Sequence, residues 1–282
     1  MNRREILRGL ACISFLSSNI KYALSEDQTL ASSIDSRLDA LSNNPRLIDL
    51  LRQVGPSEGV TFLRGILTHG IAGRHRSDRP ISERAKKLIV TFEVSNEKHY
   101  TASLQKLTWP YGSSGPTLGI GYDIGYVNKK IFDEDWTDYI DKNRIDVISA
   151  GCGLTAANGR DFVKKNQQVS ISWDEANKQF RDQMSPFLVG ETLAALPKNA
   201  EQLSPDSLGA LCSLVYNRGA SFQVADDRHT EMRNIRRLIA QGRFKDVPNE
   251  ITNMKRIWRG VPNMEGLLIR RDLEAKLFRA GL

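Results

Sequence analysis

Two carboxylic acids and a threonine lie close together in the stretch from Phe92 to Tyr126. Glu93 is at its beginning, and Thr117 and Asp123 lie on either side of a Leu-Gly-Ile-Gly-Tyr sequence. Glycoside hydrolysis needs a protonated carboxyl group that donates to the leaving oxygen, and a second polar group that holds or activates water. Glu93 can supply the first group, and Asp123 and Thr117 the second. The plainer interpretation is a surface acid, a turn aspartate and a strand threonine.

The residues around these three side chains predict the elements that position them. Ser82 is a favoured N-cap residue, and the apolar face of the helix that it opens ends next to Glu93. From His99 to Tyr126, the β-branched, aromatic and glycine residues favour an irregular sheet or hairpin. Gly119 and Gly121 would let the backbone approach a sugar closely.

Glu97 is the alternative acid, four residues after Glu93. It lies in the polar sequence Ser-Asn-Glu-Lys-His, which predicts a solvated side chain. Glu93 directly follows Phe92 at the end of an apolar face, so we favour Glu93 as the general acid.

The chain beyond Tyr126 has apolar residues at helical spacing. The expected helices cover residues 133–141, 144–149, 156–165, 173–196 with a kink at Pro186, 205–218, 230–241, 247–258 and 264–280. A short sheet inside many helices belongs to the α+β fold class.

The N-terminal part divides into three segments. Residues 1–25 have a basic start, a modest apolar stretch and small residues near a cleavage point, which indicates an export signal, of the twin-arginine type. An amphipathic first helix is the alternative. Residues 26–67 predict a small helical extension, residues 68–81 a glycine-rich basic linker, and residues 82–282 the main domain. We therefore expect a protein that is periplasmic or secreted.

The composition limits the classes of function. The chain has 282 residues, of which 40% are hydrophobic and 26% charged, and a formal net charge of +7, as in an ordinary globular protein. No apolar run is long enough for a membrane-spanning helix. Mild basicity suits an acidic polymer such as peptidoglycan, whereas no arginine-rich helix or interleaving of basic and aromatic residues indicates nucleic acid.

The histidines and cysteines indicate no metal site, because their spacing matches no ligand pattern. We expect no metal and no organic cofactor. Cys152 and Cys212 leave two interpretations open, a disulfide bridge in an exported protein or two buried thiols.

Five motifs follow one another along the chain. They are Phe-Glu-Val-Ser from residue 92, Trp-Pro-x-Gly from 109, Ser-Gly-x-Thr-x-Gly-Ile-Gly-Tyr-Asp from 114, Asn-x-Gly from 217 and Gly-Leu-x-x-Arg-Arg-x-x-Glu from 266. In this order they resemble the phage-type lysozymes, glycoside hydrolase family twenty-four, and specifically their pesticin-like branch. The resemblance covers roughly residues 82–282.

The resemblance implies a lysozyme-like fold with a cleft beside the sheet. It also implies cleavage of peptidoglycan between N-acetylmuramic acid and N-acetylglucosamine, with inversion. Glu93 matches the general acid of the family, Thr117 its water-positioning threonine and Asp123 the aspartate of the pesticin-like branch. In most phage lysozymes the aspartate lies between the glutamate and the threonine, and residues 94–116 contain no aspartate. The role of Asp123 therefore depends on the smaller branch.

Several other residues become candidates for substrate contact. Asn217 and Arg218 end a helix that the resemblance places near the cleft, although asparagine and glycine are favoured at helix ends for any function. Trp109, Tyr111 and Tyr122 could stack on sugar faces or pack in the core.

Arg270 and Arg271 are the candidates to pair with Glu93 and orient it. Glu274 lies within one helical turn and is an alternative partner for either arginine. An exposed basic pair on the helix surface is the plainer interpretation.

Two other functions fit these residues. A lytic transglycosylase would keep Glu93 as acid and base and dispense with Asp123. A non-catalytic module for cell-wall binding or toxin delivery would use a lysozyme-like fold without cleavage. We expect a monomer that acts on peptidoglycan strands; whether these belong to the cell's own wall or a competitor's, and whether an immunity or delivery partner exists, is left open.

Overall fold

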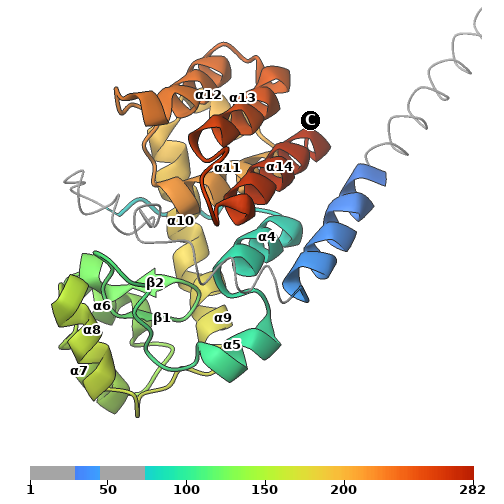
Figure 1. Cartoon of the computed structure of the whole chain (residues 1–282). Helices are drawn as coiled ribbons and strands as arrows, with labels where there is room; N and C mark the ends of the chain where they lie inside the picture. The colour runs from blue at the N-terminus through green and yellow to red at the C-terminus, as the bar shows by residue number, and fades with distance from the viewer. Residues whose placement is uncertain (1–28, 45–73) are drawn as a thin grey trace, which may run out of the picture.

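The structure is a computed structural model that describes residues 29–44 and 74–282. This part of the chain is mostly helical with one two-stranded antiparallel sheet, which is consistent with the α+β class predicted from the sequence (Figure 1). The expected export signal, residues 26–28 and 45–67 of the expected helical extension, and residues 68–73 of the expected linker lie outside the described residues.

The helices follow one another with short connections. They are α4 (Glu83–Val94), α5 (Glu97–Ser103), α6 (Lys129–Trp136), α7 (Lys142–Ser149), α8 (Ala156–Lys165), α9 (Trp173–Gln179), α10 (Ser185–Ala195), α11 (Pro205–Arg218), α12 (Thr230–Ala240), α13 (Val247–Asn253) and α14 (Glu265–Ala280). Residues 29–42 form a further helix before them. Short 3₁₀ turns cover Ile124–Tyr126, Lys198–Gln202, Asp227–His229, Phe244–Asp246 and Met254–Ile257.

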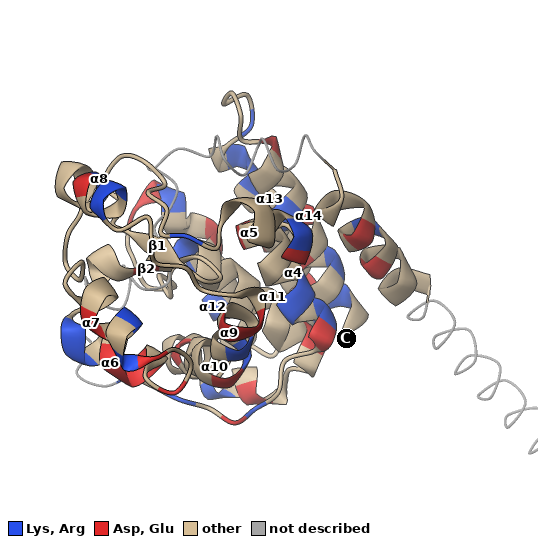
Figure 2. Ribbon diagram, turned by 90° about the horizontal axis from the view of Figure 1, so that it is seen from below, with Lys and Arg blue, Asp and Glu red and all other residues tan. Residues whose placement is uncertain are grey.

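The elements form two groups in Figure 1. In the upper group α4 packs on α11, and α11 to α14 pack on one another. In the lower group α5 to α9 lie around strands β1 (Thr117–Leu118) and β2 (Tyr122–Asp123). The two groups share one continuous core of buried apolar residues. On the outer helices, acidic and basic residues are interspersed (Figure 2).

Helix α4 begins as the sequence predicts. The Ser82 hydroxyl accepts a hydrogen bond from the Ala85 N–H at 3.1 Å and so satisfies one of the unpaired donors at the helix start. The apolar face, which includes Phe92, is buried. The helix ends at Val94, because Ser95 takes a positive φ of 67° and leaves helical geometry. Glu93 therefore lies in the last turn.

The helix of residues 29–42 packs along α4. The Arg84 guanidinium forms two hydrogen bonds with the Asp35 carboxylate, at 2.9 and 3.0 Å. At the end of the helix the Ser42 carbonyl accepts hydrogen bonds from the side chains of Ser95 and Asn96. Three apolar side chains of this helix are buried, those of Ile34, Leu38 and Leu41. The described part of the N-terminal extension is thus joined to the two residues that follow α4.

Residues 74–81 are the described part of the expected linker. They form hydrogen bonds with the long helical segment between the two groups, at the point where Pro186 interrupts its backbone hydrogen bonds. Pro186 has no N–H and cannot donate to the Asp182 carbonyl, which instead accepts from Arg76 at 3.2 Å. The Ser77 N–H donates to the Pro186 carbonyl at 3.1 Å. Over its described residues this segment is irregular but bound, and the boundaries of the domains stay predictions.

The predicted kink at Pro186 takes the form of a π-helical segment, Phe180–Met184, that joins α9 to α10. The N–H of Ser185 donates to the carbonyl of Phe180, five residues back. The wider π-helical turn before Pro186 moves the proline ring away from a clash with the preceding turn.

The predicted helices 133–141 and 247–258 end earlier in the structure, at Trp136 and Asn253. Two predicted starts differ as well. The helix expected from residue 133 already begins at Lys129, because the Asn128 side chain accepts from the Ile131 N–H and caps the helix there. The segment expected as sheet from His99 begins instead with α5, which Asn96 caps by accepting from the His99 N–H at 2.8 Å. Only the later part of that segment forms the hairpin.

Cys152 and Cys212 are free thiols, so the interpretation as a bridge between them is wrong for this structure. Burial raises the pKa of each thiol to about 12. Both are therefore protonated and unreactive at neutral pH.

None of the helices in residues 29–44 and 74–282 combines the length and the apolar composition that crossing a bilayer requires.

Helix α11 lies close to α4 at Gly209. A Cβ atom there would lie 2.2 Å from the Ala85 Cβ. We expect Gly209→Ala to lower the free energy of unfolding by about 1–3 kcal/mol, because the two helices would have to move apart.

Gly266→Ala in α14 is the matched control, since its Cβ would meet nothing within 4 Å. This variant should be neutral or more stable by up to about 1 kcal/mol, because alanine favours a helix more than glycine does. Urea unfolding of both variants measures the difference, and equal losses would contradict the close contact.

Candidate active site

The Glu93 carboxylate is held by one arginine and remains partly open to solvent. Its Oε1 accepts a hydrogen bond from Arg270 Nη1 at 2.8 Å. The Glu93 side chain is 19% exposed and that of Arg270 is 3% exposed. The prediction that Arg270 pairs with Glu93 is consistent with this geometry, and the interpretation as an exposed basic pair is wrong because both arginines are buried. Glu97, by contrast, is exposed at the start of α5.

Arg270 reaches three helices with one guanidinium group. From α14 it binds Glu93 of α4, and its Nη2 donates to the Ser213 carbonyl of α11 at 3.1 Å. Its Nε lies 3.3 Å from both the Ser213 hydroxyl and the Glu274 carboxylate. The guanidinium also lies 5.5 Å from the centre of the Phe92 ring. These contacts hold the arginine in place independently of Glu93.

Arg271 and Glu274 form a second, fully buried pair behind Arg270. Arg271 Nη2 donates to Glu274 Oε1 at 2.8 Å, and the Ser213 hydroxyl donates to the same oxygen at 2.7 Å. Burial lowers the pKa of Arg271 to about 9. Arg271 therefore supports Arg270 through Glu274, and no contact between Arg271 and Glu93 is present. The sequence prediction of a direct role for Arg271 is wrong in this respect.

The turn of the β-hairpin lies against the carboxyl group of Glu93. Gly121 has a φ of 70°, and a Cβ atom on it would lie 3.0 Å from Glu93 Oε2. The Tyr216 hydroxyl of α11 donates to the Ile120 carbonyl and fixes the turn from behind. Burial and then the nearby charge of Glu93 raise the pKa of Tyr216 well above its ordinary value. One carboxylate oxygen of Glu93 thus faces Arg270 and the other faces the glycine turn.

Thr117 and Asp123 are directly opposite each other in the hairpin. Opposed residues of an antiparallel pair have their side chains on the same face, so the structure brings these two candidates together. The Asp123 carboxylate is 2% exposed and accepts from the N–H groups of Gly115, at 3.0 and 3.1 Å, and Gly125, at 2.9 Å. The Thr117 hydroxyl, in a residue that is 9% exposed, donates to the Gly115 carbonyl at 3.4 Å. Asp123 therefore holds the loop around the hairpin.

Tyr122 lies in the core, and its prediction as a sugar-stacking residue is wrong. It is 1% exposed, and its ring packs edge to face on Trp136 with ring centres 5.6 Å apart. Its hydroxyl donates to the buried Asp135 carboxylate at 2.6 Å. Burial and the Asp135 charge raise the pKa of Tyr122 well above its ordinary value. A ring without an exposed face cannot stack on a sugar.

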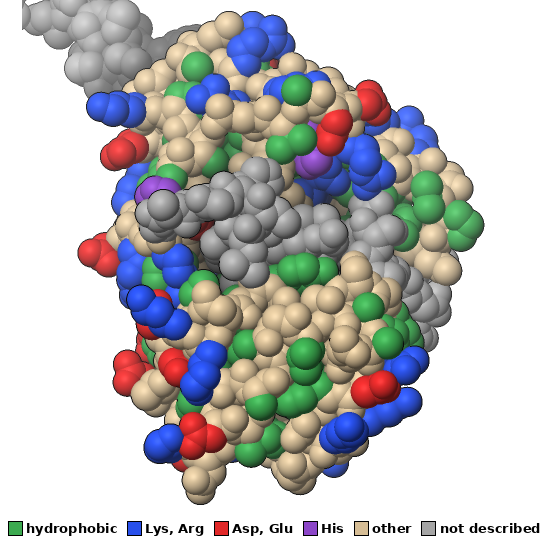
Figure 3. Space-filling view, turned by 90° about the vertical axis from the view of Figure 1, so that its left-hand side faces the viewer, with side chains coloured by type: hydrophobic (Ala, Val, Ile, Leu, Met, Phe, Trp, Pro, Cys, Tyr) green, Lys and Arg blue, Asp and Glu red, His purple; other side chains and the backbone are tan. Residues whose placement is uncertain are grey.

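Trp109 and Tyr111 form a pair of aromatic rings at the surface. Their centres are 5.2 Å apart, and the Trp109 Nε1–H donates to the Ser114 carbonyl at 2.9 Å. Tyr111 is 61% exposed and has an unusual φ of 80°. In the lower half of Figure 3, hydrophobic side chains lie toward the middle of the face and charged side chains along its edge. The aromatic pair is the part of the predicted sugar-binding set that has an accessible ring.

Asn217 and Arg218 end α11 in different environments. The Asn217 Oδ1 atom is buried without a hydrogen-bond partner, so it has an unused acceptor. Arg218 is 7% exposed, donates to the Arg228 carbonyl at 2.7 Å and lies 5.2 Å from the centre of the Trp258 ring. Arg218 is therefore engaged within the protein, whereas the Asn217 Oδ1 atom is unpaired but has no solvent access.

No group of three histidine, cysteine, aspartate or glutamate side chains in residues 29–44 and 74–282 is arranged to hold a metal ion.

Two parts of the site were missed from the sequence. Ser213 binds both Arg270 and Glu274, yet its position in the apolar helix α11 resembles that of a core residue. Asp135 is fully buried and binds Arg74 at 2.7 Å as well as Tyr122. Asp135 directly precedes the buried Trp136, and a charged residue next to an apolar stripe is the signal that could have indicated a buried pair.

The fold and the site define an α+β protein in which a partly exposed glutamate is anchored by a buried arginine beside a glycine hairpin. The chain belongs to the family described as "Domain of unknown function (DUF8812)", whose model matches residues 89–265. No curated protein matches the sequence.

The core position of Tyr122 can be tested against the surface position of Tyr111. Tyr122→Phe removes a donor from the buried Asp135 carboxylate and should lower the free energy of unfolding by about 1–3 kcal/mol. Tyr111→Phe, at an exposed ring, should stay within about 0.5 kcal/mol of the wild type. Thermal or urea unfolding measures both, and a neutral Tyr122→Phe would contradict the buried hydrogen bond.

Proposed function

We propose that this protein is an exported peptidoglycan hydrolase with a lysozyme-like fold, a muramidase that cuts between N-acetylmuramic acid and N-acetylglucosamine. The observation that carries the proposal is the anchored carboxyl group of Glu93, 19% exposed, with one oxygen on a buried arginine and the other against the Gly121 turn. The resemblance of the surrounding motifs to phage-type lysozymes supports the same substrate and bond.

In the proposed reaction Glu93 donates its proton to the glycosidic oxygen. Arg270 fixes the direction of the carboxyl group and leaves Oε2 on the side of the hairpin. A proton donor must be aimed at the leaving oxygen, and a single hydrogen bond to a rigid partner provides that aim without occupying the second oxygen. A water molecule then attacks the anomeric carbon from the opposite face, so the product has inverted configuration.

Asp123 and Thr117 are proposed to hold the attacking water. Their side chains lie on the same face of the hairpin, and the hairpin is the element that meets Glu93. The Asp123 carboxylate accepts hydrogen bonds from the Gly115 and Gly125 N–H groups, and an aspartate carboxylate can accept a proton from water. Thr117 contributes a hydroxyl that can orient the same water.

Sugar contact is assigned to the accessible residues near the hairpin. Trp109 and Tyr111 precede β1 and present aromatic rings, of which that of Tyr111 is open to solvent. For Asn217, sugar contact stays a prediction, because its Oδ1 atom at the end of α11 is unpaired but buried. Aromatic rings stack on the apolar faces of sugars, and amide acceptors bind their hydroxyl groups.

A lytic transglycosylase is the second candidate, and the state of Asp123 favours it. The Asp123 carboxylate is 2% exposed and is already used by backbone N–H groups of the loop, whereas Glu93 has solvent access. In that reaction Glu93 protonates the leaving oxygen and then takes a proton from the C6 hydroxyl of the muramic acid. The hydroxyl oxygen replaces the leaving group at C1, which gives an anhydro-sugar end and consumes no water.

Glu93→Gln tests whether this residue is the acid. The amide keeps the size of the side chain but cannot donate a catalytic proton, so fragment release from peptidoglycan should fall by about 100-fold or more. Glu97→Gln is the matched control, four residues away and exposed, and should keep near wild-type activity.

Reducing ends and soluble fragments are measured for wild type and both variants, with thermal unfolding to confirm folding. Equal release by wild type and Glu93→Gln would reject Glu93 as the acid, whereas no release from wild type on several wall types would reject the hydrolase and support a non-catalytic module.

The products separate the two candidate reactions. A hydrolase gives fragments with a reducing N-acetylmuramic acid end, and reduction by borohydride should add two hydrogen atoms to each. A lytic transglycosylase gives anhydro ends that borohydride leaves unchanged. We expect reducible ends in mass spectra of the fragments, and anhydro ends throughout would assign the reaction to Glu93 alone.

A further inference from the structure

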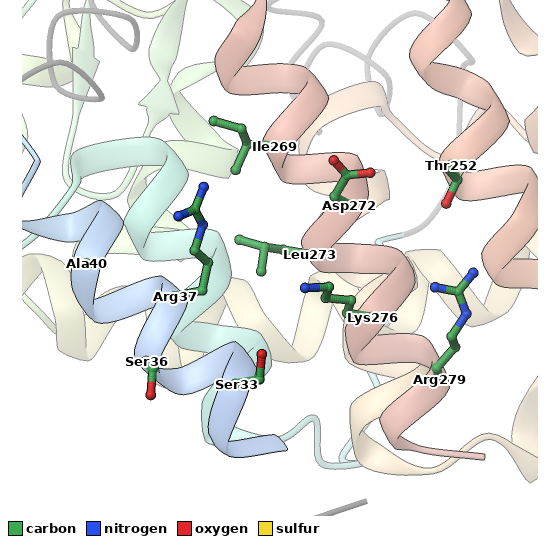
Figure 4. A pocket seen from close by; sticks show the side chains of 10 residues that line it. All are labelled: Ser33, Ser36, Arg37, Ala40, Thr252, Ile269, Asp272, Leu273, Lys276 and Arg279. Atoms are coloured by element: carbon green, nitrogen blue, oxygen red, sulfur yellow. The ribbon is translucent and has the colours of Figure 1, made fainter. Parts of the chain in front are cut away.

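A groove with a volume of about 750 Å³ lies between the helix of residues 29–42 and α14. Figure 4 shows Leu273 and Lys276 pointing from α14 toward that helix, with Arg37 on the opposite wall. The groove is separate from the Glu93 site, since Arg270 turns to α4 and α11 while its neighbour Ile269 lines the groove.

The groove carries an excess of positive charge. Arg37 and Lys276 are exposed, and their side chains form no ion pair or hydrogen bond with any residue in 29–44 or 74–282. Arg279 has a single contact, at 3.4 Å to the neutral amide of Asn249. The one acid on the wall, Asp272, is paired with Lys255 at 2.7 and 2.8 Å. Three cations therefore share one concave surface without an acidic partner.

The floor of the groove is apolar. Leu273 is buried beneath it, and Ile269 is partly buried beside it. Hydroxyl groups of two serines and of Thr252 add donors on the walls. A matching ligand has several negative groups and small apolar groups between them. A plain polyphosphate would leave the apolar floor uncovered, whereas an acidic peptide would cover it.

The size of the groove favours a short ligand. A volume of about 750 Å³ is within the range of small-ligand sites. We propose that the groove binds a short acidic peptide, with carboxylates on Arg37, Lys276 and Arg279 and small side chains on Leu273. We assign its source to the carboxylate-bearing peptide stems of peptidoglycan, an assignment that rests on the proposed function.

This site would hold the enzyme on its substrate away from the bond that is cut. Arginine binds carboxylates with two parallel hydrogen bonds, and Lys276 adds a point charge. Because the groove and Arg270 share α14, a strand in the cleft and a stem in the groove would be bound by different sides of one helix. The groove should therefore contribute to affinity for the polymer and not to the chemical step.

The test measures co-sedimentation with purified insoluble peptidoglycan. The parent is Glu93→Gln, so that the polymer stays intact during the assay, and the groove variant adds Arg37→Gln, Lys276→Gln and Arg279→Gln. The matched control adds three neutral changes at exposed basic residues elsewhere: Lys198→Gln, Lys245→Gln and Arg259→Gln. Both triple variants lose the same charge, so general electrostatic attraction is equal in them.

We expect the apparent Kd of the groove variant to rise by about 10-fold, and that of the control to rise by less than about twofold. Added salt should weaken the binding of the parent and of the control to peptidoglycan more than that of the groove variant, because the groove variant lacks the specific ion pairs. Equal sedimentation of the groove variant and the control would overturn the proposal. Circular dichroism melting shows that all three proteins are folded.

A soluble probe separates the ligand chemistry from its source. The peptide Ala-Glu-Glu-Ala should shift backbone resonances of α14 in the parent, and Ala-Gln-Gln-Ala should not. Peptide binding with sedimentation equal to the control would assign the groove to an acidic protein segment and overturn the wall assignment. If wild type releases no fragments from the wall while the groove variant still loses sedimentation, the proposed catalytic function fails and the groove proposal stands.

Discussion

The contact between the Arg270 guanidinium and the Glu93 carboxylate is the interaction on which the rest of the site depends. It joins the last turn of α4 to α14, and the Ser213 carbonyl joins both to α11. A buried arginine is costly to desolvate, and the cost is offset only when its donors are used. Here Ser213, Glu274 and Glu93 use them. The position of the glutamate is therefore set by three packed helices.

The second constraint is the attachment of the hairpin to the same helices. The Tyr216 hydroxyl binds the Ile120 carbonyl from α11, which is the helix that supplies Ser213. Glycine at position 121 lets the turn come close to Glu93, and the positive φ there suits glycine above other residues. The carboxyl group and the hairpin are thus positioned by one shared helix, so their separation does not depend on the irregular loop between residues 104 and 116.

The sequence predicted the elements better than the contacts. Helices with periodic apolar residues were placed well, such as α8 and α11, whose predicted bounds match the structure; of the two, α11 has a side-chain cap, at Ser204. The starts of α5 and α6 were not predicted, although Asn96 and Asn128 cap them. In a sequence, an asparagine that caps a helix looks the same as one in a turn until the N–H donor that it binds is known. Tyr122 was predicted to contact sugar but lies in the core. Alternation along a strand does not say which face of the strand meets the core.

Contacts between distant segments were harder still. The pairing of Arg270 with Glu93 was among the predicted alternatives, but Ser213, Asp135 and the binding of residues 74–81 to α10 were not. Each joins residues tens of positions apart, and a single sequence contains no distance between them. What the residue types do indicate is that a buried charge needs a partner; they do not say which one.

The contact between Arg270 of α14 and Glu93 of α4 also bears on which residues a fragment of this protein must contain to keep the site. The family match covers residues 89–265, which includes Glu93 but stops at the first residue of α14. A fragment cut at those limits would keep the glutamate and lose Arg270, Arg271 and Glu274, so Ser213 would face an empty helix position. It would also lose the first half of α4, together with the Ser82 cap. The matched segment is thus shorter than the set of helices that pack together in this protein, and a fragment that keeps the contact between Glu93 and Arg270 has to include both α4 and α14.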